Sequence, residues 1–153
     1  MVDVNDLRGL GVKQSMPLAW ESALTGQGAG TFEIAFMPYA GLDFGGHFDH
    51  AHQDYLQFWI EYGAFGWMLL ALFVLISSWY AFKAMRMKDS KIRSGLGFGL
   101  LMAIITIAIH SFSDFNLQIP ANAITFIVVC AMAILTVFHR RMHRQPISQS
   151  VDV

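Results

Sequence analysis

Charged side chains are scarce in this chain. They make up only 14% of its 153 residues, whereas 55% of the residues are hydrophobic. Soluble domains carry about 25% charged residues, so a shortage of this size indicates a membrane protein. The net charge of −1 also lacks the strongly basic balance that nucleic-acid binding normally requires. We therefore expect membrane lipid around the chain and no nucleic-acid partner.

Cysteine is nearly absent. Cys130 is the only one, and it lies in an apolar run. One cysteine excludes a disulfide framework and a cysteine-based zinc site within the chain. We expect Cys130 to be a small buried hydrophobic residue.

The opening residues also lack the continuous apolar run of a signal peptide. A helix is compatible with residues 5–24, and Pro17 is expected to interrupt it. Glycines crowd the sequence between Gly26 and Gly46, which predicts loops and tight turns. We assign residues 1–62 to an irregular region outside the bilayer.

Three long uncharged runs follow, at about 64–82, 95–112 and 121–138. About 20 apolar residues in a helix cross a hydrocarbon core of about 30 Å. The expected fold is therefore all-α and integral to the membrane, with three spans within residues 63–138 and a tail at 139–153. Before the first run, residues 54–62 place four aromatic side chains at helical spacing, which predicts an interfacial helix; these are Tyr55, Phe58, Trp59 and Tyr62.

The basic residues predict the orientation. Eight of the ten lysines and arginines lie in the 83–93 loop and the 139–153 tail, and none lies in the 113–119 turn. By the positive-inside rule, the loop and the tail are cytoplasmic. Residues 1–62 are then extracytoplasmic, where chemistry requires an activated substrate or hydrolysis because ATP is absent.

The densest group of titratable side chains lies in this outer region, directly before the first span. It comprises His47, Asp49, His50, His52 and Asp54. Histidine and carboxylate ligands suit zinc, although the spacing is not that of a zinc protease. One histidine could instead be a general base, because its pKa lies near neutrality. A solvated loop is the third interpretation, and the spacing alone does not choose among them.

Three further features are candidates for binding. The glycine-rich residues 25–32 resemble a phosphate-binding loop only weakly, since the P-loop lysine is missing, and a tight turn is the favoured interpretation. His110 and Asp114 are four residues apart, so a helix would place them on one face near the outer boundary. Arg8 is a candidate partner for phosphate oxygens.

The order of these motifs resembles a known family. A Gly-x-Gly-x-Gly-Thr-Phe turn, a His-x-His-Gln-Asp-Tyr-Leu-Gln run and a His-Ser-x-x-Asp-Phe-x-Leu-x-x-Pro-Ala-Asn-Ala segment occur in sequence, separated by spans. This arrangement is similar to the C-terminal half of the O-antigen ligase/polymerase superfamily of bacterial membrane glycosyltransferases. The most specific match is His52 and Gln53, followed by nine residues and then Gly63.

The resemblance implies a GT-C-like enzyme of the bacterial inner membrane, multi-pass and with a periplasmic N-terminal region. Such an enzyme moves a glycan from undecaprenyl diphosphate to a lipid A-core or polysaccharide hydroxyl, without metal or other cofactor. His52 takes the position of the catalytic base. The implied substrate-binding residues are Arg8, Gln53, Asp54, Glu61, His110 and Asp114.

Since the family carries about eight earlier spans, the chain is expected to be the C-terminal part of a larger enzyme and to need those N-terminal helices as partners. Two other hypotheses remain from the sequence. One is a non-enzymatic membrane module that binds a metal or a partner through residues 47–54. The other is a membrane subunit that only completes another protein's helix bundle.

Overall fold

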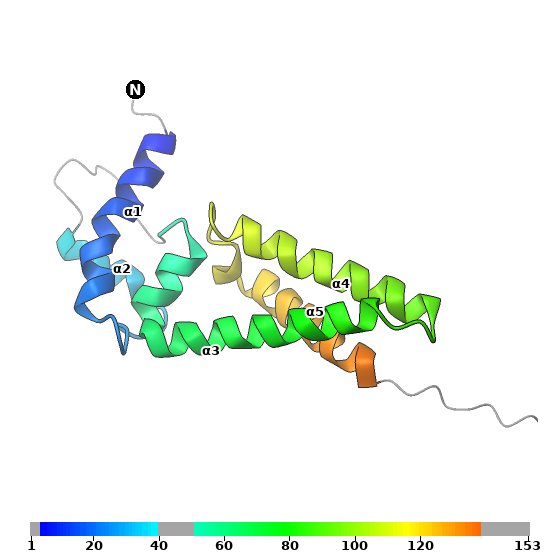
Figure 1. Cartoon of the computed structure of the whole chain (residues 1–153). Coiled ribbons are helices and arrows are strands. Elements are labelled where there is room, and N and C mark those ends of the chain that lie inside the picture. Colours follow the sequence, from blue (N-terminus) through cyan, green and yellow to red (C-terminus); the bar gives the residue numbers. More distant parts are fainter. Residues whose placement is uncertain (1–3, 40–50, 139–153) are drawn as a thin grey trace, which may run out of the picture.

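The computed structural model describes residues 4–39 and 51–138. In this part of the chain every regular element is helical, and three of the helices are long and apolar enough to cross a membrane. The predicted all-α membrane fold is therefore confirmed. The elements, in order, are α1 (Val4–Glu21), α2 (Phe32–Phe36), η1 (Met37–Tyr39), α3 (Asp54–Met85), α4 (Lys91–His110), η2 (Asn116–Gln118) and α5 (Pro120–Phe138) (Figure 1).

Helix α3 consists of two parts that meet at Gly63. The backbone of Gly63 is not helical, with φ of 66° and ψ of −177°. The first part therefore runs at an angle to the second, as Figure 1 shows. Residues 64–85, together with α4 and α5, form the apolar bundle, whereas residues 54–62 turn aside at its end.

Small residues hold the bundle together. Ala81, Cys130 and Ala133 are completely buried between the spans, and Leu100 and Ile104 pack with them. A side chain on Gly97 would collide with the backbone of α3, so glycine allows α3 and α4 to approach closely. The prediction that Cys130 is a buried hydrophobic residue is confirmed. Large apolar side chains point outward instead, as expected for helices that face lipid; they include Leu72, Leu75, Ile105, Ile127 and Leu135.

A second cluster forms the outer region. Leu18 of α1 and both phenylalanines of α2 pack on Leu56 and Ile60, which lie in the first part of α3. The helix predicted around residues 5–24 exists, but the prediction that Pro17 interrupts it was wrong. Pro17 is exposed, so its ring points away from this core and α1 forgoes only one backbone hydrogen bond there.

Candidate functional site

The glycine-rich turn wraps around the break in α3. We call residues 22–31 the glycine strap. The amides of Gln27 and Gly28 donate to the carbonyl oxygens of Ile60 and Glu61, at 2.8 and 2.9 Å. In the other direction, the Ala64 amide donates to the carbonyl of Ala23 at 2.7 Å. The strap thereby satisfies backbone groups that the break at Gly63 removes from the helix.

The strap and the break approach each other so closely that both need glycine. A Cβ on Gly26 would collide with the carbonyl of Glu61, and a Cβ on Gly63 would collide with the carbonyl of Leu24. Both glycines also have positive φ, 74° and 66°, which other residues rarely adopt. These glycines therefore serve backbone packing, as the tight-turn interpretation expected, and the amides of Gln27, Gly28 and Gly30 in the strap all donate to α3.

A relay of side-chain hydrogen bonds connects the strap to the residue before His52. The carboxylate of Glu61 accepts from the Gly30 amide at 3.1 Å and from the side-chain nitrogen of Gln57 at 3.1 Å. The side-chain oxygen of Gln57 accepts from the Ala51 amide at 3.3 Å. Both side chains are buried, with 2% of each exposed. Glu61 thus reaches the loop that carries His52 through one intermediate side chain.

His52 lies where the first part of α3 begins. Its φ of 52° is the only positive value among the non-glycine residues described. Histidine is enriched among the few residue types that adopt this conformation. The half-buried ring meets Phe115 edge-on, with 5.2 Å between centroids and 69° between planes. Phe115 belongs to residues 110–119, which connect α4 to α5 and which we call the second outer motif; the first outer motif is residues 51–63. His52 of the first outer motif is thus positioned against the second.

Asp54 joins the same two motifs through its backbone and its side chain. Its amide donates to the carbonyl of Ser111 at 3.1 Å. Its fully buried carboxylate accepts from the Leu117 amide, at 3.2 Å to one oxygen and 3.0 Å to the other. Burial removes water from this carboxylate, and the Leu117 amide offsets part of that cost. Next to it, Tyr55 donates to the carbonyl of Ala108 at 2.8 Å.

The second outer motif is arranged differently from the sequence prediction. Helix α4 ends at His110, and Asp114 lies beyond it in the turn, so the expected shared helical face was wrong. Asp114 accepts a hydrogen bond from the amide of Phe115 at 2.9 Å and so fixes the turn that presents that ring to His52. His110 is exposed at the end of the helix.

An apolar cavity begins beside this junction. Its volume is about 450 Å³, and residues of α3, α4 and α5 line it. Asp54, Tyr55, Ser111 and Leu117 contribute to its wall, while the rest is aliphatic or aromatic, including Val74. The junction of the two outer motifs therefore adjoins a space that suits a hydrocarbon chain.

For the remaining candidate residues the structure gives fewer contacts or does not describe the side chain. Gln53 is half-buried at the start of α3, and its carbonyl accepts the amide of Gln57. Arg8 lies in α1, and its side chain is outside what the structure describes. His47 and His50 lie outside the described residues, and with them most of the proposed metal site. Among the described residues no group of three histidine, cysteine or acidic side chains could hold a metal ion.

Two residues at the junction belong to the motifs quoted from the sequence but were not named as candidate site residues. Phe115 contacts His52 only because α4 and α5 bring the second motif back to α3. Gln57 lies one helical turn before Glu61, and this spacing could have indicated their hydrogen bond. Phe115 had no comparable local signal.

Replacing Asp54 by alanine is expected to loosen the connection between α4 and α5. A hydrogen bond to a charged group contributes about 1.5–3 kcal/mol, so hydrogen exchange at the Leu117 amide should accelerate by roughly tenfold to a hundredfold. Asp54→Asn is the matched control, because its amide oxygen still accepts from Leu117. Equal exchange in the two variants would contradict the assigned role of this carboxylate.

Comparison with known proteins agrees with the resemblance seen in the sequence. Residues 4–71 match the family model described as O-Antigen ligase. This match contains α1, the glycine strap, His52 and the break at Gly63. No curated protein and no solved structure matches the chain. Over residues 4–71 the chain is thus similar to the O-Antigen ligase family, in agreement with the resemblance predicted from the sequence.

Proposed function

We propose that the chain forms part of a glycosyltransferase that moves a glycan from undecaprenyl diphosphate to an acceptor hydroxyl. The observation that carries this proposal is the junction at His52. An imidazole within the family-matched segment is positioned against the second outer motif, and Asp54, two residues after it, lines the apolar cavity. The acceptor is a lipid A-core or a growing polysaccharide, and no cofactor takes part.

In the proposed reaction, His52 takes the proton from the acceptor hydroxyl. The acceptor oxygen attacks the anomeric carbon, and the bond from that carbon to the diphosphate oxygen breaks. Undecaprenyl diphosphate leaves with the bonding electrons, and Arg8 stabilises its charge. The part of the lipid's hydrocarbon chain nearest the diphosphate occupies the apolar cavity.

The other predicted residues divide into two groups. Gln53 and His110 have side chains that are at least partly exposed, so we assign them to direct contact with substrate. Asp54 and Asp114 accept hydrogen bonds from backbone amides of the second outer motif, and Glu61 accepts one from the Gly30 amide of the glycine strap. We assign these three carboxylates to positioning His52 and the turn that faces it.

The proposal places the enzyme in the bacterial inner membrane with residues 1–62 in the periplasm. The distribution of lysine and arginine supports this orientation. This orientation also places His52 on the side of the membrane where the lipid-linked donor is used. The N-terminal helices of the family would complete the site.

The test is glycan transfer in native membranes from cells with and without the gene. Donor carrying undecaprenyl diphosphate and a radiolabelled glycan is supplied with acceptor, and labelled acceptor and released lipid diphosphate are measured. We expect one lipid diphosphate per glycan transferred and no transfer after deletion. Unchanged transfer would overturn the proposal. Tight stoichiometric zinc binding in equilibrium dialysis, lost when His50 and His52 are replaced together, would favour the metal-binding module instead.

A further inference from the structure

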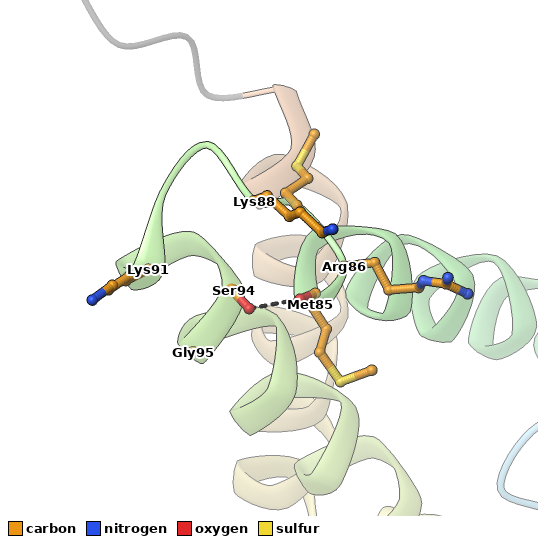
Figure 2. A pocket seen from close by; sticks show the side chains of 7 residues that line it. Met85, Arg86, Lys88, Lys91, Ser94 and Gly95 are labelled. Carbon is orange, nitrogen blue, oxygen red and sulfur yellow. Dashed lines mark hydrogen bonds between the residues drawn. The ribbon is translucent and has the colours of Figure 1, made fainter.

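A basic hollow lies at the opposite end of the bundle from His52, where α3 connects to α4. Its volume is about 680 Å³, and three of the residues that line it are cations. These are Arg86, Lys88 and Lys91, and Figure 2 shows Lys91 on one side of the hollow, with Lys88 and Arg86 on the other. We call this space the basic hollow.

The floor of the hollow is held in place by the ends of the two spans. Ser94 donates a hydrogen bond to the carbonyl of Met85 at 2.6 Å, which joins α4 to the end of α3 (Figure 2). Gly95 adds no side chain there, and a Cβ at this position would meet no atom within 4 Å. The hollow is therefore open to solvent on one side, and its base is fixed by the hydrogen bond between Ser94 and Met85.

The positive charge of the hollow is not offset by the acid nearest to it in the sequence. Asp89 is the only acidic residue between positions 83 and 93. Its carboxylate accepts from Arg93 at 2.8 Å, and Arg93 does not line the hollow. Lys88 and Lys91 are exposed, so their ammonium groups can reach a ligand.

The position of the basic hollow relative to the bilayer indicates which kind of anion it can bind. The hollow lies directly after residues 64–85 of α3 and before the apolar part of α4, which is the level of lipid headgroups. Its wall also contains the apolar side chains of Met85 and Met87. Basic pockets between membrane helices suit anionic headgroups, because phosphate meets the cations while the acyl chains remain in the bilayer.

We propose that the basic hollow binds the phosphodiester headgroup of an anionic phospholipid. The phosphate oxygens contact Arg86 and one or both lysines, and the acyl chains descend along the apolar surface of the bundle. This site is separate from the glycan-transfer site and does not depend on that function. The bound lipid would hold the α3–α4 connection at the membrane surface.

The test is lipid binding to the purified protein in neutral detergent, measured by native mass spectrometry. Phosphatidylglycerol should bind more tightly than phosphatidylcholine. Each cation near an anionic surface contributes roughly fivefold in affinity. Lys88→Gln should therefore weaken phosphatidylglycerol binding by about fivefold, and the triple replacement of Arg86, Lys88 and Lys91 by glutamine by at least about fiftyfold.

Lys83→Gln is the matched control, because Lys83 is an exposed cation of the same stretch that does not line the hollow. It should change affinity by less than about twofold. Helical circular dichroism and gel filtration check that each variant is folded. Equal effects of Lys83→Gln and Lys88→Gln, or equal binding of the two lipids, would overturn the proposal. Displacement of phosphatidylglycerol by equimolar inorganic phosphate would assign the hollow to free phosphate and overturn its lipid assignment.

Discussion

Replacing His52 by asparagine is expected to reduce glycan transfer by about a hundredfold to ten thousandfold, the range that general-base catalysis contributes. Asparagine is the appropriate replacement because it tolerates the positive φ of 52° found at this position. The local backbone should therefore survive, and the loss should come from the missing imidazole. Initial rates of transfer from the lipid-linked donor measure the effect.

Two additional measurements separate catalysis from structure at His52. Added imidazole should restore part of the lost activity, since it replaces the base but not the contact with Phe115. Phe115→Leu should instead lower activity without becoming sensitive to imidazole. His110→Asn is the comparison variant: loss of its proposed substrate contact should lower transfer, but added imidazole should not restore it, because His110 has no proposed role as a base. Normal transfer by the His52→Asn variant would exclude His52 as the base.

The spans could be predicted from the sequence because the bilayer imposes a simple rule on them. Runs of about 20 uncharged residues are required to cross it, and the second and third predicted spans correspond to α4 and α5. The interruption at Pro17 was predicted wrongly because local propensity was weighed without tertiary packing. Leu18 and Ala19, directly after the proline, are buried in the outer cluster, which favours continuing the helix.

The candidate site was predicted only in its local part. The spacing from His52 to Gly63 is explained by the structure, because the nine residues between Gln53 and Gly63 are the helical segment that begins at Asp54. The contacts with Phe115 and Leu117 join positions 63 residues apart in the chain. No spacing rule within one helix or loop predicts such pairs, since they depend on how α4 and α5 pack.

Substitutions of the glycines where the strap meets the break in α3 are expected to have the second large effect, a loss of stability of the outer region. Replacing Gly63 or Gly26 by alanine should open the outer region, because each added Cβ would collide with a backbone carbonyl and each residue would keep a positive φ. A left-handed conformation alone costs about 1–2 kcal/mol in a non-glycine residue, and the backbone conformation of Gly63, with ψ of −177°, is adopted almost exclusively by glycine. Backbone atoms cannot move aside as a side chain can. We therefore expect each substitution to destabilise the packed outer region by at least about 3 kcal/mol in total.

Hydrogen exchange of the strap measures this cost. The amides of Gln27 and Gly28, which donate to α3, should exchange at least about a hundredfold faster in either variant. Gly30→Ala is the matched control, because Gly30 also has a positive φ, 67°, but a Cβ there would meet no atom within 4 Å. It should accelerate exchange by about fivefold to thirtyfold. If all three variants behaved alike, conformational strain alone would explain the glycines. A larger effect at Gly26 and Gly63 would show that close backbone packing of the strap on the break stabilises the outer region, in which residues 54–62 follow His52.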